Sequence, residues 1–242
     1  MDVVYIFKED AENNSEDLRY SLRSLQNLPH NKVFIAGDKP AWVTNIRHIS
    51  VAQTKTKGEN WSMNLSATVK SLEVSDNFLM MNDDFFIMKK LSTIPNLNMG
   101  MMADVITLYK QRYPEGSTYI DKMCRLYEIL KLQGYDNPVS YELHTPMILS
   151  KQKVIDFYSK LQGQQILQFR TYYGNYYNLG GEPVEDVKIF LDNKHNSPDY
   201  TINPEQYLTE QVFLSSTGGA FKKGLVGDFI RKSFPNKSIY EV

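Results

Sequence analysis

The chain has 242 residues, a length that corresponds to one large domain or two small ones and that can bury a substantial core. It carries 27 Lys and Arg against 28 Asp and Glu residues, and its 42% hydrophobic and 23% charged residues are typical of a soluble globular protein, which excludes a disordered, coiled-coil or collagen-like chain. The net charge of −1 disfavours a dedicated nucleic-acid binder, which usually has a basic excess, but it leaves a local basic groove open.

The sequence also lacks a targeting signal and a pair of cysteines for a disulfide. No apolar run approaches the roughly 18 residues of a membrane-spanning helix, and the first residues lack the basic stretch of a signal peptide. The single cysteine, Cys124, cannot form an internal disulfide, and it lies in a helix-like stretch where a small buried side chain is expected. We therefore expect a cytoplasmic protein without a membrane span.

The first 51 residues predict a strand, a helix and two further strands. Residues 3–7 are apolar and β-branched or aromatic, which indicates a buried strand. Ser15, followed by two acidic residues, is a typical helix cap, and leucines at helical spacing continue from there to Pro29. Residues 32–36 and 46–51 read as strands. This order implies a parallel pair of strands around a connecting helix.

A further helix and strand lead to a group of acidic residues. Leu65, Val69 and Leu72 mark a helix that we expect to begin near residues 60–62. Residues 78–81 form an apolar strand that runs directly into Asn82-Asp83-Asp84. Since ligands gather at the carboxyl ends of strands in open α/β sheets, this is where we expect a site.

The second half of the chain has a more mixed pattern. Residues 101–109 read as a strand or an apolar crossover. Apolar residues over 120–130 predict a helix that closes at Gly134, and residues 147–149 predict a short strand. Ser150 is placed to cap the next helix.

The remaining segments complete one predicted domain. Residues 180–183 read as a loop, and Asn203 followed by Pro204 predicts the start of another helix. There is no internal repeat, low-complexity tract or interdomain linker. We predict a single α/β domain with a C-terminal extension of helices and strands.

Paired carboxylates after a buried strand require a partner, because burying an unpaired charge is costly. In an extended chain Asn82 and Asp84 project to one side and Asp83 to the other. This D-x-D-like arrangement suits Mg²⁺ or Mn²⁺, which take a few protein oxygens and leave other positions to diphosphate oxygens and water. An Asn-Asp-Asp turn without a metal is equally compatible with these residues alone.

Three further features have both a structural and a functional interpretation. His144 lies at an expected element boundary, where a structural histidine is favoured on spacing alone. Arg170 is an isolated cation in an apolar stretch, which is consistent with a buried salt bridge or with phosphate binding. The tyrosines over 172–177 suit either a half-buried surface, which we favour, or stacking on sugar rings. No P-loop, dinucleotide fingerprint, Gly-x-Ser-x-Gly elbow or paired-histidine zinc motif is present.

Four ordered pieces of the sequence form a recognisable set of blocks. The first is Met1-Asp2-Val3-Val4-Tyr5. The second runs from residues 18–25 through 33–35 and Pro40-Ala41-Trp42 to 78–85, the third pairs His144 and Pro146 with Phe169-Arg170, and the fourth is residues 234–241. These pieces resemble the Stealth family of sugar-1-phosphate transferases, although the Trp-Val-(Asp/Asn)-Gly that normally follows the first block is replaced by Ile6-Phe7-Lys8-Glu9 and residues 53–66 match the family pattern poorly.

This resemblance implies a GT-A-like, Rossmann-like fold with a mixed, mostly parallel sheet flanked by helices. It implies one transferase domain over residues 1–242, with a nucleotide- and metal-binding half at 1–110 and an acceptor half at 111–242. A nucleotide-sugar, most simply a UDP-sugar, is then expected to bind through Mg²⁺ or Mn²⁺ at Asp83 and Asp84. Asp83, His144 and Arg170 are the expected catalytic residues, and the expected donor-binding residues are Asp2, Val4, Tyr5, Arg19, Arg23 and Asn60.

The implied reaction is transfer of a sugar-1-phosphate to a hydroxyl of a glycan or cell-surface polymer. The first alternative is a glycosyltransferase on the same scaffold, which transfers the sugar itself to a glycan, a polymer or a modified nucleobase. The second is an inactive sugar- or nucleotide-binding module. The presence of Asp83, Asp84, His144 and Arg170 disfavours that module, since a retired active site tends to lose its charged residues.

Overall fold

The computed structural model describes residues 1–9, 15–161, 168–192 and 195–242, which form two compact units. Unit 1 comprises Met1–Ile94, His144–Ile155 and Val187–Val242, and unit 2 comprises Pro95–Leu143 and Asp156–Asp186. Because the units interleave along the chain, neither coincides with residues 1–110 or 111–242, and the functional division of the chain stays a prediction.

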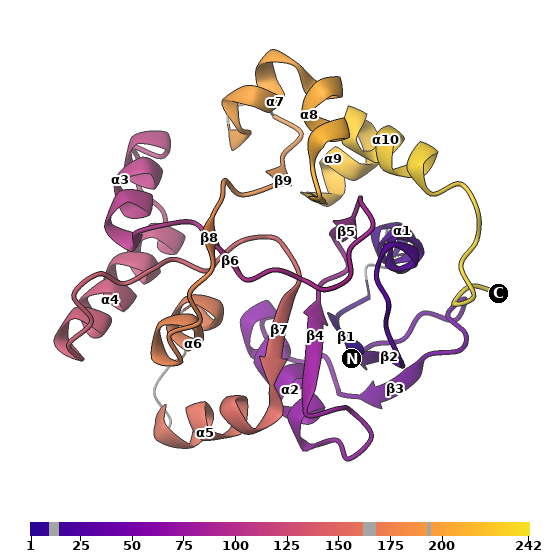
Figure 1. Cartoon of the computed structure of the whole chain (residues 1–242), viewed down its shortest axis with the longest axis horizontal. Coiled ribbons are helices and arrows are strands. Elements are labelled where there is room, and N and C mark those ends of the chain that lie inside the picture. The colour runs from indigo at the N-terminus through magenta and orange to yellow at the C-terminus, as the bar shows by residue number, and fades with distance from the viewer. Residues whose placement is uncertain (10–14, 162–167, 193–194) are drawn as a thin grey trace. The chain divides into compact units, whose positions relative to one another are not determined.

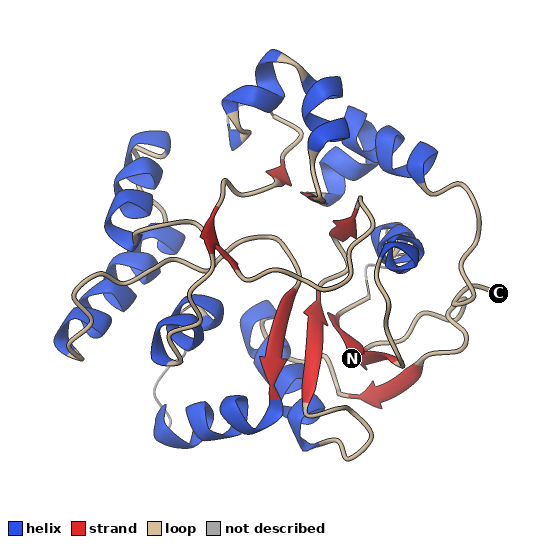
Figure 2. Ribbon diagram, viewed as in Figure 1, coloured by secondary structure: helices blue, strands red, loops and turns tan. Residues whose placement is uncertain are grey.

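Unit 1 is built on a five-stranded sheet with the order β3-β2-β1-β4-β7 (Figures 1 and 2). β1 pairs in parallel with β2 and β4, β2 pairs in parallel with β3, and β4 pairs antiparallel with β7. The predicted strands and the parallel pair are therefore confirmed, and the fold is α/β. The strands are β1 (Asp2–Phe7), β2 (Val33–Gly37), β3 (Arg47–Ser50), β4 (Asn77–Met81) and β7 (Met147–Ser150).

β1 is the central strand, and all six of its residues are buried. Its apolar residues are continuous because both faces of the sheet are covered. In the sheet, Tyr5 pairs with Ile35 of β2 and with Met81 of β4. The strands that follow β1 in the chain lie on one side of it, at β2 and β3, whereas β4 lies on the other. This reversal makes the carboxyl ends of β1 and β4 the expected place for a ligand.

Two helices of unit 1 follow β1 and β3 in the chain. The first, α1 (Glu16–Ser24), continues into the 3-10 turn η1 (Leu25–Asn27), as the leucine spacing predicted. The predicted Ser15 cap is wrong: Ser15 is left-handed, with φ 49°, and its side chain makes no capping hydrogen bond. The second, α2 (Lys57–Lys70), packs on β1, β2 and β3.

The predicted start of α2 at residues 60–62 is also wrong. The helix begins at Lys57, because Thr56 and Glu59 form a capping box in which each side chain bonds the other residue's backbone N–H. The helix ends at Lys70, so Leu72 lies outside it and is 99% exposed. The apolar spacing therefore located the helix but not its ends.

A second, three-stranded sheet belongs to unit 1, with β10 antiparallel to β5 and parallel to β9. Phe86 of β5 stacks on Phe221, with ring centroids 5.7 Å apart, and Leu214 and Ile230 complete this apolar core. The predicted helix start is confirmed, since the Asn203 side chain accepts a hydrogen bond from Gln206 N. The strand β5 (Phe85–Ile87) directly follows the acidic residues. The other elements form the expected C-terminal extension: β9 (Lys188–Ile189), α7 (Pro198–Ile202), α8 (Pro204–Glu210), β10 (Phe213–Ser216), α9 (Gly218–Lys223) and α10 (Leu225–Ser233).

Unit 2 is mainly helical, with one short parallel strand pair. Residues 101–109, predicted as a strand or an apolar crossover, form most of a helix and its N-cap, because Met102, Val105 and Ile106 have helical spacing on one buried face. The predicted helix ending at Gly134, with φ 91°, is confirmed. The predicted loop 180–183 contains a two-residue strand. The elements are β6 (Leu97–Asn98), α3 (Met102–Arg112), α4 (Thr118–Leu132), the later part of α5 (Lys151–Leu161), α6 (Phe169–Tyr176) and β8 (Glu182–Pro183).

The described part of the chain was also searched for membrane spans. None of its helices combines the length and the apolar character needed to cross a bilayer.

Candidate functional site

The acidic residues lie in a turn that joins the two sheets of unit 1. Residues 82–84 connect β4 to β5, and Phe85 N donates a hydrogen bond to Asn82 O at 3.3 Å. Because this segment is a turn and not extended, the expected projection of Asn82 and Asp84 to one side does not apply. All three side chains are partly exposed, and they lie at the carboxyl end of β4, where the sheet topology favours ligand binding.

Asp84 is held by two side chains of the smaller sheet. Its Oδ2 forms an ion pair with Nζ of Lys188 and accepts a hydrogen bond from Oγ of Ser215 at 3.3 Å. Lys188 and Ser215 are partners in the register of β9 and β10, so both approach the carboxylate from one strand pair. Asp84 therefore carries a compensated charge in this structure.

Asp83 has an unusual proton affinity. Burial raises the pKa of its carboxyl to about 7, and the negative charges of Asp84 and Asp17 act in the same direction. A backbone hydrogen bond at Asp83 and the charge of Lys188 oppose this shift. Asp83 can thus accept or release a proton near neutral pH, which is the property required of a general base.

A chain of hydrogen bonds fixes the end of this turn to α1. Ser21 Oγ donates to Phe85 O at 2.5 Å and in turn accepts from the Tyr5 hydroxyl at 3.0 Å. Burial raises the pKa of Tyr5 far above its usual value, with smaller contributions from Tyr240 and Asp83 and an opposing one from Ser21, so the phenol stays neutral. Tyr5 therefore helps to hold the turn in place through its hydrogen bond to Ser21.

His144 is brought to the same region by the sheet. β7 runs antiparallel to β4, with Met147 opposite Met80, so the segment before β7 passes the end of β4. There the His144 ring lies edge-on to Phe85, with centroids 6.3 Å apart. The structure thus brings His144 to the turn that holds Asp83 and Asp84.

Arg170 lies in unit 2, on α6. It is buried and donates a hydrogen bond from its guanidinium to Leu143 O. Its predicted role beside a phosphate stays a prediction. The neighbouring Tyr172 and Tyr173 pack edge-on against Phe157, with centroid distances of 5.1 and 6.1 Å, so these two tyrosines are more deeply buried than the half-buried surface that the sequence favoured.

Several of the predicted donor-binding residues have structural partners. Asp2 lies at the amino end of β1, away from the acidic turn, and its carboxylate accepts hydrogen bonds from Lys32 N at 3.2 Å and Ser75 N at 2.8 Å. Val4 and Tyr5 are fully buried in the core. Asn60 closes the loop before α2 through two hydrogen bonds with the Lys55 backbone. Their surroundings give no support to the expectation that these four side chains contact a donor.

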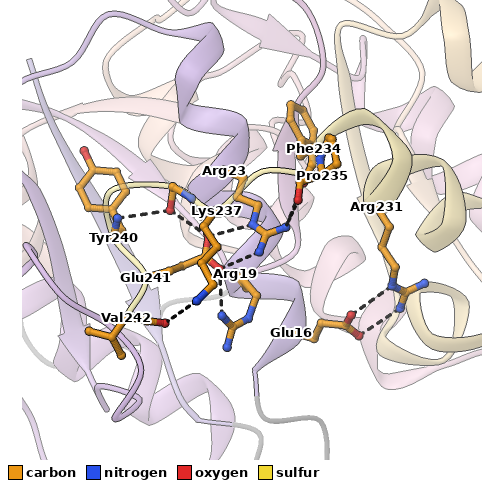
Figure 3. Close-up of polar contacts among 11 residues, drawn as sticks. Glu16, Arg19, Arg23, Arg231, Phe234, Pro235, Lys237, Tyr240, Glu241 and Val242 are labelled. Atoms are coloured by element: carbon orange, nitrogen blue, oxygen red, sulfur yellow. Dashed lines mark hydrogen bonds and ion pairs between the residues drawn. The ribbon is translucent and has the colours of Figure 1, made fainter.

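Arg19 and Arg23 bind the last residues of the chain (Figure 3). Arg23 contacts both carboxylate oxygens of Glu241 at 2.8 Å and donates to Phe234 O at 3.0 Å, and Arg19 contacts Glu241 at 2.9 Å. The sequence blocks at 18–25 and 234–241, which share the family resemblance, are therefore in direct contact. Both guanidinium groups are bound to Glu241 in this structure, and their role in donor binding stays a prediction.

The residues of the acidic turn fit a hard divalent cation. Asp83 and Asp84 are adjacent carboxylates, and Asn82 Oδ1 is buried without a hydrogen-bond partner among the described residues. Mg²⁺ and Mn²⁺ are commonly held by one or two carboxylates, with substrate phosphates and water completing the coordination. A cage built from protein side chains alone is not present in the described ranges, where no group of three or more His, Cys, Asp or Glu residues is arranged for a metal.

Comparison with protein-family models and with curated proteins finds no match to this chain.

Three residues of the site, Lys188, Ser215 and Asp17, were not predicted from the sequence. Lys188 belongs to a two-residue strand and Ser215 to a short apolar one, so neither has a motif around it. Asp17 was read as a helix-start residue, and only the packing of α1 shows its effect on Asp83.

Proposed function

We propose that this protein is a metal-dependent transferase that moves a sugar-1-phosphate from a nucleotide-sugar, most simply a UDP-sugar, to a hydroxyl of a glycan or polymer. The proposal includes a fold related to the GT-A glycosyltransferases. It is carried by one observation: two adjacent carboxylates, Asp83 and Asp84, lie at the carboxyl end of β4, beside the point where the strand order reverses.

The charge of this turn favours a diphosphate bound through a cation. Asp17, Asp83 and Asp84 are negative when ionised, so they would repel a diphosphate that approached alone. A divalent ion held by Asp83 and Asp84 would supply the positive charge that binds the diphosphate and stabilises charge on its oxygens. The acidic turn thus suits a nucleotide-sugar better than an uncharged sugar.

The protein residues can support the proton transfer that the reaction requires. The acceptor oxygen forms a bond to the phosphorus that carries the sugar, the bond from that phosphorus to the bridging oxygen breaks, and a nucleoside monophosphate leaves. Asp83 is proposed as base or as second metal ligand: its pKa of about 7 in the protein without metal suits it to take the acceptor proton where Asp84 alone holds the ion, because a carboxylate bound to the ion would stay ionised. His144, beside Phe85, is the second acid or base.

The nucleotide that leaves distinguishes this reaction from glycosyl transfer. The protein is incubated with UDP-, GDP- and CMP-sugars and Mn²⁺ or Mg²⁺, with water as the default acceptor, and the nucleotides are separated by anion-exchange chromatography. Release of monophosphate from a diphosphate donor, suppressed by chelator, supports attack at phosphorus. Release of diphosphate identifies attack at the sugar carbon, and binding of the donor without turnover identifies a binding module.

Asp84→Asn tests the site itself. The amide keeps the size of the side chain but loses the charge, so we expect metal-dependent release of nucleotide to fall by about 100-fold or more. Asp76→Asn is the matched control, since Asp76 is exposed and immediately precedes β4, at the opposite end of that strand. Both variants should keep the wild-type circular dichroism spectrum. Unchanged turnover in folded Asp84→Asn would remove this residue from the site.

A further inference from the structure

Lys188 occupies a position where a cation is expected. Its ammonium lies against Asp84 Oδ2, and the two side chains are only 12% and 19% exposed. The same oxygen accepts the hydrogen bond from Ser215, so it is already compensated without a metal. This pairing joins β9 of the smaller sheet to the turn that follows β4.

A divalent ion and the Lys188 ammonium cannot both occupy this place without repulsion. Two positive charges a few ångströms apart repel strongly in a partly buried site, where solvent screens them poorly. The local acids are Asp17, Asp83 and Asp84, and Lys188 is the basic residue among the charges that act on Asp83. Movement of Lys188 away from Asp84 would free Oδ2 for the ion.

We propose that Lys188 is a built-in counter-ion, which a divalent cation must displace from Asp84 in order to bind. The inference rests on the proposed function, because it takes Asp84 as a metal ligand. The displaced ammonium needs a new anionic partner, and the diphosphate group of a nucleotide supplies one. Lys188 thereby makes binding of the ion depend on binding of the nucleotide.

Direct Mn²⁺ titration tests the proposal without catalysis. Free Mn²⁺ is measured by electron paramagnetic resonance in the absence of nucleotide, for wild-type protein, Lys188→Gln and Lys222→Gln. Lys222 is exposed on α9, so its replacement makes the same change in net charge away from the site. We expect Lys188→Gln to bind Mn²⁺ about tenfold or more tightly than wild type, and Lys222→Gln to bind it as wild type does.

Two further variants separate this inference from the proposed function. Lys188→Arg keeps the positive charge and should retain the weak wild-type affinity, whereas Asp84→Asn should abolish binding. Equal or weaker binding by Lys188→Gln, with binding still lost in Asp84→Asn, would overturn the inference and leave the metal site intact. Absence of Mn²⁺ binding in every variant, with or without UDP, would overturn both.

A wild-type measurement covers the case in which Lys188→Gln does not fold. UDP should increase the Mn²⁺ retained by wild-type protein by about tenfold beyond the Mn²⁺–UDP complex measured in buffer alone. A gain that equals the buffer complex would overturn the proposed coupling. Circular dichroism of each variant establishes that it is folded before it is titrated.

Discussion

Asp83 has a side chain whose ionised form conflicts with the stability of the fold. Its carboxyl is partly buried among other acids, and the pKa is raised to about 7 as a result. In the unfolded chain the same group has a pKa near 4. The folded protein must therefore bind a proton, or accept an unfavourable charge, at every pH above about 4.

This conflict predicts that Asp83→Asn stabilises the protein at neutral pH. Because the folded state binds more protons than the unfolded state between about pH 4 and pH 7, the free energy of unfolding of wild type should fall as pH rises through this window. The neutral amide removes this dependence. We expect a gain of about 1–2 kcal/mol at pH 7.5 and little at pH 4, after discounting the shift for the partial exposure of the carboxylate.

Urea denaturation at the two pH values, in the presence of chelator, measures this effect. Asp76→Asn is again the control, since Asp76 is exposed and should give wild-type stability at both pH values. A destabilised Asp83→Asn at pH 7.5 would show that the Asp83 carboxylate is favourably paired in the fold.

At the scale of single elements, Ser15 stands where sequence and structure disagree. The residue precedes two acids and a helix, which is the pattern of a cap, yet it adopts φ 49° and its buried Oγ has no hydrogen-bond partner among the described residues. Left-handed backbone is costly for residues other than glycine. The helix is held by the buried Leu18 and Leu22 and not by its cap.

Ser15→Gly should therefore stabilise the protein by about 0.5–1 kcal/mol, because glycine adopts φ 49° without strain and removes the unpaired hydroxyl. Ser117→Gly is the comparison, since Ser117 is extended and its side chain accepts the hydrogen bond from Ile120 N that caps α4. That substitution should destabilise by a few tenths of a kcal/mol. Thermal unfolding of both variants would contradict this account if the two midpoints moved in the same direction.

The elements that could be predicted are those with a strong apolar pattern. Residues 3–7 and 78–81 form buried strands, and the leucines of α1 repeat with a spacing that fits only a helix. Residues 101–109 could not be assigned, because a short apolar run satisfies both periods until its packing is known. The sequence Thr-x-x-Glu at Thr56 is the pattern of a capping box. The start of the helix was predicted too late because the prediction used the apolar residues, which lie further along the helix.

At the scale of the molecule, the site depends on contacts between distant segments. Asp83 and Asp84 could be selected from the sequence because they follow a strand, whereas His144 was selected only through the family resemblance. Their partners could not, since Asp84 is 104 positions from Lys188 and 131 from Ser215. Arg19 and Arg23 were predicted to bind the donor, and the partner they meet in the structure, Glu241, lies more than 200 residues away.

The contacts of Glu241 with Arg19 and Arg23 attach the last residues of the chain to the rest of unit 1. Glu241 is fully buried at its side chain and pairs with Arg19 and Arg23, while Val242 N donates to Trp42 O at 3.0 Å and Thr44 N donates to Tyr240 O at 3.0 Å. The last residues of the chain thus bind both α1 (Figure 3) and the segment between β2 and β3. Loss of one charged partner would leave two cations facing an uncharged group.

Glu241→Gln should lower the free energy of unfolding at pH 7 by about 3 kcal/mol, the usual effect of breaking a buried ion pair. Although burial raises the pKa of Glu241, bonds from Arg23, the Ser238 backbone and Arg19 bring it down to about 2. A lowered pKa contributes stability above the unfolded value near 4.5 and loses it as pH falls toward 2, so the gap between wild type and variant should close over that window. Glu115→Gln, at an exposed loop residue, is the control for the loss of one carboxylate. A constant gap between pH 7 and pH 2 would show that the destabilisation of Glu241→Gln does not come from loss of the carboxylate charge.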